Sequence, residues 1–313
     1  MPLLTILTST KPFVVPHIIN IQRNAFQSWK ALGPEVDIVV VGEETGLAEV
    51  CRELGLRRAP DVRRNRGGTP LVSSIFELGR QASSSPWLAY VNADIILLPD
   101  FLEGARKAAA SFEQFLIVGQ RWDLDVPAPI DFSSGWQARL WQRVPAAGQL
   151  HRRVGSDYFI FPRACFTDIP DLTVGRAFWD NWMIYWARRN HWPTIDGSAA
   201  IQIIHQNHDY SHLPQGQSHH KHPDTFENIR LGGGARTTFV LDDADKVLTP
   251  AGLAPMPMTW KKFWREVEIY PLVTLHSYPL AQAAYALFHP LKAVYHLLQA
   301  LWSKTVLWTG RKG

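Results

Sequence analysis

Short apolar runs alternate with helix-period segments in the first part of the chain. The apolar runs are nearly continuous, as in strands buried on both faces, and the segments between them repeat apolar residues every three or four positions. This alternation predicts an α/β fold, a mostly parallel central sheet with helices on both faces. The expected strands lie at 3–7, 36–41, 87–91 and 115–119, and the expected helices at 17–32, 47–54, 70–82 and 101–112.

Polar residues stand where three of these strands end. They are Thr8-Ser9-Thr10, Gly42-Glu43-Glu44 and Asn92-Ala93-Asp94. In open parallel sheets, ligands bind at the carboxyl ends of the strands. We therefore expect the three polar tips to converge on one crevice.

Asp94 lies between two apolar runs, 87–91 and 95–98. A carboxylate in such surroundings is costly unless a cation pairs with it. A divalent metal ion carrying a diphosphate is the obvious partner, and it indicates an enzyme with a nucleotide-activated donor, most simply a nucleotide sugar. A polar turn is the alternative, since Asn and Asp are favoured in turns. Similar triplets occur at 123–125, which could border the same crevice, and at 243–245, which is typical of an exposed turn.

Further polar groups follow Asp94 in a fixed order: Gly155-Ser156-Asp157, then Trp179-Asp180-Asn181, then His205 or His208. With the first triplet, this order resembles the GT-A glycosyltransferase superfamily. Its members carry an Asp-x-Asp metal motif, a glycine-containing loop, a Glu-Asp pair that supplies the base, and a late metal-binding histidine. The resemblance covers roughly residues 3–210 and rests on several coupled motifs.

The resemblance implies a metal site and a donor site. Asp94 resembles the metal-binding carboxylate, and His205 or His208 the histidine that completes the shell around Mn²⁺ or Mg²⁺. Asn92 stands where a first carboxylate is usual, so weaker metal binding is expected. Asn92 and Ala93 are then expected to contact the donor.

The resemblance also implies an acceptor site. Gly155, Ser156 and Asp157 resemble the loop beside donor and acceptor, and Asp180 resembles the catalytic base. Trp179 stands where a glutamate is usual, so we expect acceptor contacts there by stacking. Asp180 could instead only be the N-cap of the helix expected at 181–189, a role worth about 1 kcal/mol. The two roles are compatible, because a helix N-terminus favours an ionised carboxylate that can accept a proton.

Several other residues are candidates for donor binding. Thr8 and Thr10 are base or ribose contacts if the resemblance holds, and Lys11 could meet phosphate. Arg66 and Thr69 belong to a basic, glycine-containing segment, 63–70, that could bind phosphate at the start of the next helix. A solvated loop is the alternative. We expect no nucleic-acid partner, since the basic residues are local and no nucleic-acid motif is found.

Histidines crowd the segment 205–222, which invites a zinc interpretation. No cysteine lies nearby and the spacing fits no standard finger. We expect instead a loop that closes over the donor and places one histidine on the metal. The choice between His205 and His208 stays open.

The C-terminal part, 251–313, is rich in Trp and Pro and is expected to be helical from about residue 280. No Asp or Glu follows Glu268, whereas Lys292, Lys304, Arg311 and Lys312 do. Apolar residues at helical spacing from Leu291 to Trp302 suggest either a helix packed on the catalytic domain or an anchor on a membrane surface. The chain shows no signal peptide pattern, and its two cysteines favour a reducing cytosol.

These features predict a catalytic domain at 1–250 and a helical extension at 251–313. The predicted activity is metal-dependent transfer of a sugar, hexose or pentose, from a nucleotide diphosphate to an acceptor hydroxyl, with inversion. The acceptor would be a carbohydrate or a lipid-linked molecule, and the protein would be cytoplasmic or peripheral on the membrane. A nucleotidyltransferase is the enzymatic alternative, although a Gly-rich signature after the first strand is missing. A non-catalytic binding protein with a decayed site is the other.

Overall fold

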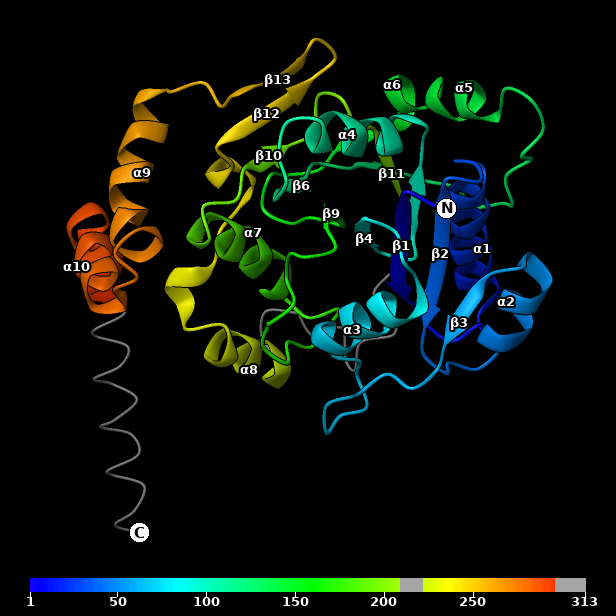
Figure 1. Cartoon of the computed structure of the whole chain (residues 1–313), viewed down its shortest axis with the longest axis horizontal. Coiled ribbons are helices and arrows are strands. Elements are labelled where there is room, and N and C mark those ends of the chain that lie inside the picture. Colours follow the sequence, from blue (N-terminus) through cyan, green and yellow to red (C-terminus); the bar gives the residue numbers. More distant parts are fainter. Residues whose placement is uncertain (209–221, 296–313) are drawn as a thin grey trace. The chain divides into compact units, whose positions relative to one another are not determined.

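The computed structural model describes residues 1–208 and 222–295, and the chain divides into two compact units, Met1–Met256 and Pro257–Gly313. Figure 1 labels the helices and strands of both units. The predicted division at residue 250 falls in the turn between two paired strands, β12 (Lys246–Thr249) and β13 (Gly252–Pro255). The division into a catalytic domain and an extension stays a prediction.

The first unit is built on a sheet that has nine strands in the part of the chain that the structure describes. Pairing is parallel through β3, β2, β1 and β4 and through β6, β10 and β12, while β9 runs antiparallel between β4 and β6. The prediction of a mostly parallel sheet is confirmed. The strand order is β13, β12, β10 (Thr194–Asp196), β6 (Leu116–Val118), β9 (Tyr158–Pro162), β4 (Trp87–Val91), β1 (Leu4–Ser9), β2 (Val36–Val41), β3 (Arg57–Ala59).

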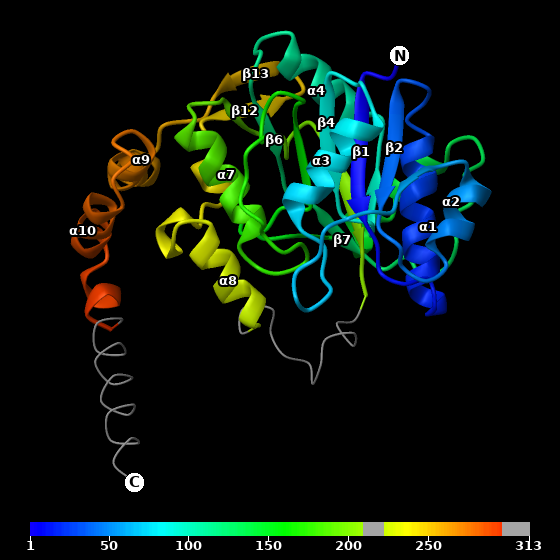
Figure 2. The same cartoon turned by 60° about the horizontal axis from the view of Figure 1, so that its bottom comes forward.

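Helices cover both faces of this sheet, as predicted (Figure 2). The alternation of side chains along a strand sends Leu4 and Ile6 into a core shared with α1 (Pro16–Lys30), α2 (Leu47–Leu54) and α4 (Asp100–Ala109). Leu7 points the other way, against Gly79 of α3 (Val72–Ala82), where an added Cβ would lie 2.4 Å from Leu7. The rings of β4 and β9 on that face also meet α7 (Trp179–Arg189).

A smaller sheet, ordered β5, β11, β7, β8, extends the fold beyond the end of β4. Its central strand β11 (Ile203–Gln206) pairs antiparallel with β5 (Ile95–Leu97) and parallel with β7 (Trp122–Leu124). β8 (Gln149–Leu150) and the short helices α5 (Trp136–Trp141) and α6 (Val144–Ala147) complete this region. Because β5 directly follows the turn at Asp94, this pairing brings the histidine strand beside that turn.

Some element boundaries differ from the sequence-based prediction. The apolar run at 201–204 leads into β11, Ile203–Gln206, so His205 lies inside a strand. The interpretation of Asp180 as an N-cap is wrong, because α7 begins at Trp179 and Phe178 is its N-cap. The histidine-rich segment is described only up to His208 and again from His222, where it leads into α8 (Pro223–Leu231). His212, His219 and His220 lie outside the described residues.

The described part of the second unit includes α9 (Trp260–Val273) and α10 (Tyr278–Phe288), which pack on each other. Helix α10 agrees with the helix expected from about residue 280, whereas α9 was not anticipated. No described helix is long and apolar enough to cross a membrane. Of the tail residues, Trp302, Lys304, Arg311 and Lys312 lie outside the described residues.

Candidate functional site

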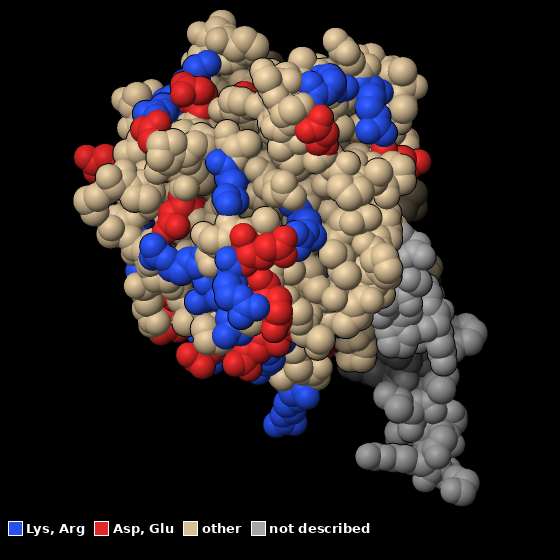
Figure 3. Space-filling model, turned by 90° about the vertical axis from the view of Figure 1, so that its right-hand side faces the viewer, with Lys and Arg blue, Asp and Glu red and all other residues tan. Residues whose placement is uncertain are grey.

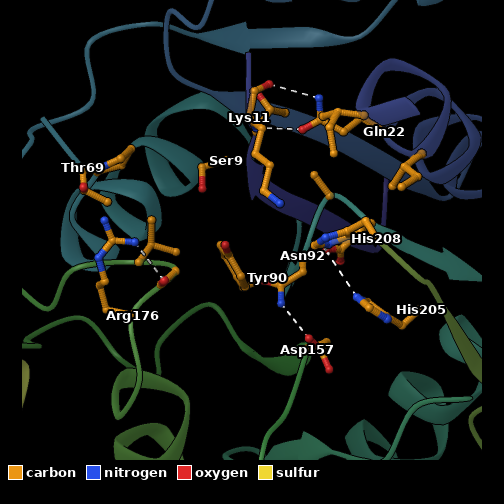
Figure 4. A pocket seen from close by; sticks show the side chains of 18 of the residues that line it. Ser9, Lys11, Gln22, Thr69, Tyr90, Asn92, Asp157, Arg176, His205 and His208 are labelled. Carbon is orange, nitrogen blue, oxygen red and sulfur yellow. Dashed lines mark hydrogen bonds and ion pairs between the residues drawn. The ribbon is translucent and has the colours of Figure 1, made fainter. Parts of the chain in front are cut away.

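A cavity of about 340 Å³ opens where β1 and β4 end, at the carboxyl edge of the parallel strands (Figure 4). Its size is within the range of small-ligand sites. Nine of the residues predicted from the sequence line it: Thr10, Lys11, Thr69, Asn92, Ala93, Asp94, Asp157, His205 and His208.

Asp94 lies against both late histidines. Its Oδ2 is 3.1 Å from Nε2 of His208 and 3.7 Å from Nε2 of His205. Pairing of β5 with β11 sets this arrangement, because His205 is in register with Ile95 and the backbone N–H of Gln206 donates to the carbonyl of Asp94 over 3.1 Å. The structure thus brings both His205 and His208 to the same carboxylate.

These three side chains fit a divalent metal ion. One ligand atom from each of Asp94, His205 and His208 lies within 4.8 Å of the others. The other carboxylate oxygen, Oδ1 of Asp94, is buried and has no hydrogen-bond partner among the described residues. Such an atom is costly unless a cation satisfies it. A carboxylate with two imidazoles is a ligand set suited to first-row transition metals.

The charges of the cluster favour the presence of a cation beside Asp94. Burial opposes ionisation of Asp94, but hydrogen bonds from His205 and His208 outweigh it and hold the pKa of the carboxyl well below its usual range. Burial likewise lowers the pKa of His205, but Asp123 and Asp94 outweigh it and raise that pKa to about 9. Asp94 is thus an anion that draws cations to this position.

Asp123 orients one of the histidines from the side away from Asp94. Its carboxylate lies 3.0 Å from Nδ1 of His205, and it also meets Nε of Arg121 and Nδ1 of His151, each at 2.8 Å. A carboxylate beside the far nitrogen favours the ring orientation in which Nε2 faces Asp94. Asp123 and Asp125, expected to border the crevice, do not line the cavity, and Asp123 meets it only through His205 and Arg121.

Asn92 is tied to the loop before β9 and not to the metal position. Its Nδ2 donates to Oδ1 of Asp157 over 2.8 Å, and its backbone N–H donates to the Asp157 carbonyl over 3.0 Å. Nη1 of Arg121 lies 2.6 Å from both oxygens of the same carboxylate. An amide at position 92 can donate to Asp157, which a carboxylate could not do. The amide of Asn92 thus has a structural partner in Asp157.

Cationic and hydroxyl groups line the rest of the cavity. The buried side chain of Gln22 accepts from the backbone N–H of Lys11 over 2.7 Å and donates to its carbonyl over 3.0 Å, which fixes the segment from which Lys11 extends into the cavity (Figure 4). Oγ1 of Thr10 is buried without a hydrogen-bond partner among the described residues. Arg176 enters from the opposite side, held 3.4 Å from Asp224 of α8.

Sequence reasoning missed Arg121 and Arg176. Arg121 follows the expected strand at 115–119, so the strand-end rule could have indicated it. Arg176 stands in an irregular segment before α7, and no local pattern indicates it.

Asp180 lies beside the glycine-containing loop. Its Oδ2 would be 3.7 Å from a Cβ added to Gly155, and it accepts from the backbone of Asn181 and Ser156. Burial and the nearby Asp157 carboxylate outweigh these hydrogen bonds and raise the pKa of Asp180 to about 6. Ser156 and Asp157 are themselves buried. Gly155, Ser156 and Asp180 do not line the cavity, but Asp157 does and joins them to it.

Three predicted residues occupy other surroundings. Trp179 is only 4% exposed, with its ring centroid 5.0 Å from that of Tyr90 and 5.1 Å from that of Phe159, so the stacking expected with an acceptor is replaced by core packing. Thr8 is fully buried in β1, and its hydroxyl donates to the carbonyl of Ser9. Arg66 is exposed and does not line the cavity.

Surface charge is mixed on the face over α1 and α2. Figure 3 shows Lys and Arg side chains interspersed with Asp and Glu there. Arg23 of α1 pairs with Glu53 of α2, and Arg57 lies 3.2 Å from Asp37. Two arginines of the segment 63–70 also form ion pairs. Arg64 lies 2.8 Å from Glu44, and Arg63 lies 3.1 Å from Asp171.

No family model matches this sequence, and no curated protein matches it. Solved structures do match. Glucosyl-3-phosphoglycerate synthase from Mycobacterium tuberculosis, in complex with Mn²⁺, UDP and glucosyl-3-phosphoglycerate, is 14% identical with a TM-score of 0.44, over 68% of this chain and 75% of that chain. A second structure of that synthase holds Mg²⁺ and UDP.

Two further matches come from other organisms. S. aureus TarS in complex with UDP-GlcNAc is 12% identical with a TM-score of 0.44, over 74% of this chain and 65% of that chain. The mannosyltransferase PcManGT from Pyrobaculum calidifontis, with GDP-Man and Mn²⁺, is 13% identical with a TM-score of 0.40. The match covers 67% of this chain and 58% of that chain. The three matched structures hold UDP, UDP-GlcNAc and GDP-Man, respectively.

Proposed function

We propose that this protein is a metal-dependent glycosyltransferase that moves a sugar from a nucleoside diphosphate to an acceptor hydroxyl. The observation that carries the proposal is the cluster of Asp94, His205 and His208 at the end of β4, in a cavity that also holds Lys11 and Arg176. A carboxylate with an unpartnered oxygen between two imidazoles suits a divalent ion. Cationic side chains on both sides of the cavity suit a diphosphate.

Asp94, His205 and His208 would hold Mn²⁺ or Mg²⁺, and the bound ion would supply charge neutralisation to the departing nucleoside diphosphate. Lys11 and Arg176 would bind phosphate oxygens, each from its own side of the cavity (Figure 4). The unpartnered hydroxyl of Thr10 is a donor-binding group, together with Thr69, Asn92 and Ala93. Asp123 and Gln206 would keep the ligands in place by binding His205 and the backbone of Asp94.

Asp180 is the base in this proposal. With a pKa of about 6 it is ionised at neutral pH, yet basic enough to accept the proton of an acceptor hydroxyl. Gly155, Ser156 and Asp157 would line the acceptor side. A hydroxyl deprotonated by Asp180 would attack the anomeric carbon on the face opposite to the diphosphate, so the configuration would be inverted.

The sugar that is transferred would be a hexose or a pentose. We propose a carbohydrate or lipid-linked acceptor, as in polysaccharide biosynthesis, and a cytoplasmic protein that associates peripherally with a membrane through residues 251–313. The alternative of a decayed binding site is not favoured, since Asn92 has a partner in Asp157 and the ligand cluster is assembled without it.

The test is calorimetric titration of the protein with UDP and GDP, with and without Mn²⁺. Binding that needs Mn²⁺ in the unmodified chain and is lost in Asp94→Asn is expected. The control is Asp171→Asn, a carboxylate that pairs with Arg63 away from the cavity. Equal nucleotide binding without metal, or in Asp94→Asn, would contradict the proposal.

A further inference from the structure

Helix α9 presents an apolar stripe on its exposed surface. Trp260, Phe263, Trp264, Val267 and Tyr270 follow one another at helical spacing, and each has between 40% and 75% of its surface exposed. The buried residues of the same helix include Ile269, Leu272 and Val273, so α9 has apolar residues on both sides. A water-facing helix surface normally carries polar residues.

The aromatic residues of this stripe gather at the start of the helix. Ring centroids lie 5.3 Å apart for Trp260 and Trp264, 5.2 Å for Phe263 and Trp264, and 6.0 Å for Trp260 and Phe263. Trp264 also contacts Phe288 of α10, with centroids 5.8 Å apart. The cluster therefore joins the two helices into one aromatic surface.

Helix α10 continues this surface. Its sequence, Tyr278–Phe288, contains no Lys, Arg, Asp or Glu. Leu287 is 78% exposed, and beyond the helix Leu291 is 86% exposed. Uncharged helices with leucines this exposed are normally covered by another apolar phase.

The fully exposed charges around this surface are basic, because Glu266 and Glu268 of α9 are less exposed and lie against Lys262 and Arg265. Lys261 and Lys292 are exposed, and no Asp or Glu follows Glu268 in the sequence. Tryptophan and tyrosine beside basic residues are typical of segments at the boundary between lipid headgroups and acyl chains. A second copy of the chain fits less well, because an isologous contact would bring the same basic residues together.

We infer that α9 and α10 form a docking surface for anionic lipid. The stripe of Trp260, Phe263, Trp264, Val267 and Tyr270 would enter the headgroup region, and Lys261 and Lys292 would meet lipid phosphates. This deepens the peripheral membrane association proposed above. It does not depend on the transferase activity, so the two can fail separately.

The test is co-sedimentation of the full chain with vesicles of phosphatidylcholine, alone and mixed with phosphatidylglycerol. The double variant Trp260→Glu, Phe263→Glu removes two rings and adds two negative charges. Its partition onto mixed vesicles should fall at least about tenfold. The matched control is Phe226→Glu, an aromatic residue of α8 that is 60% exposed in the first unit. It should bind like the unmodified chain.

A second pair, Lys261→Glu and Lys292→Glu, should remove the preference for phosphatidylglycerol. Circular dichroism and Mn²⁺-dependent UDP binding, both without vesicles, show whether each variant is folded and whether the donor site is intact. Three results would overturn the inference. They are no sedimentation with either vesicle, equal sedimentation of the double variant, and a solution dimer that the double variant dissociates while vesicles stay unbound.

Discussion

Nδ2 of Asn92 donates a hydrogen bond of 2.8 Å to Oδ1 of Asp157, which also accepts from Arg121. This contact ties the turn that carries Asp94 to the loop that carries the predicted acceptor site. It gives position 92 a role in holding the cavity together, without a role as metal ligand.

Asn92→Asp should therefore lower the stability of the folded protein, and it should not increase the affinity for the metal ion. The change removes a donor and places a second carboxylate against Asp157, so the free energy of unfolding should fall by about 1–3 kcal/mol. Asn92→Ala removes the hydrogen bond without adding charge and should cost less. Urea unfolding and Mn²⁺ titration of both variants measure this. The account would be contradicted if Asn92→Asp were as stable as the unmodified chain and bound Mn²⁺ more tightly, because the hydrogen bond to Asp157 would then not explain the amide at position 92.

The ligand set predicts a preference for Mn²⁺ over Mg²⁺, because Mg²⁺ favours oxygen ligands and two of the three groups here are imidazoles. His205→Ala and His208→Ala should each weaken Mn²⁺ binding at least about tenfold. Calorimetry measures both effects. His191→Asn serves as control, since His191 lies outside the cluster and its φ of 57° is tolerated by Asn. If either cluster histidine can be replaced without loss, it is not a ligand.

Asp180 predicts the pH dependence of transfer. Since its pKa is about 6, the rate should fall as the pH drops through 6 and level off above it. Asp180→Asn should keep Mn²⁺-dependent nucleotide binding and lose transfer. If the unmodified chain transferred sugar as fast at pH 5 as at pH 8, Asp180 would not be the catalytic base.

The same raised pKa has a consequence for stability. An acid whose pKa is higher in the folded state than in the unfolded state binds more protons when folded, so its contribution is present at low pH and lost as the pH rises through about 6. Relative to the unmodified chain, Asp180→Asn should thus be more stable at pH 8 than at pH 5, by about 1–2 kcal/mol. Unfolding in urea at the two pH values checks the sign, and the opposite sign would contradict the raised pKa.

Gln206 connects the metal ligands to α1. Its buried Nε2 donates to the carbonyls of Ile21 and Asp94, and its Oε1 accepts from Asn24. Gln206→Leu should leave these groups unsatisfied, lower the free energy of unfolding by about 2–4 kcal/mol and weaken Mn²⁺ binding. Gln202→Leu is a control on the same segment, partly buried and bonded elsewhere. If Gln206→Leu resembles Gln202→Leu in urea unfolding and Mn²⁺ titration, the Asp94 turn does not depend on Gln206.

The main sheet follows from local patterns. The strands at 36–41 and 87–91 and the helix at 47–54 have the predicted bounds. Their hydrophobic patterns can be recognised because each extends over a few consecutive residues. Gly55, in the left-handed region with φ 64°, ends that helix as a glycine C-cap does. Two of the three polar tips, those with Thr10 and Asp94, meet at one cavity as expected from the shared edge of parallel strands, whereas Gly42-Glu43-Glu44 does not line it.

Long-range pairing could not be predicted in the same way. Whether His205 or His208 reaches Asp94 depends on the register of β11 against β5, residues more than a hundred positions apart in the chain. The burial of Trp179 depends on two rings from separate strands, Tyr90 and Phe159. The exposed stripe of α9 was missed because periodicity indicates an apolar face but not what covers it.

Turnover of a panel of nucleotide sugars tests the central claim most directly. The unmodified chain, Asp94→Asn and Asp180→Asn would each be incubated with UDP- and GDP-linked hexoses and pentoses, with and without Mn²⁺, while release of the nucleoside diphosphate is followed. We expect at least one donor to be cleaved by the unmodified chain with Mn²⁺ and by neither variant, with Asp180→Asn still binding that donor. Binding of donors without turnover of any, or turnover that survives in Asp94→Asn, would contradict the account.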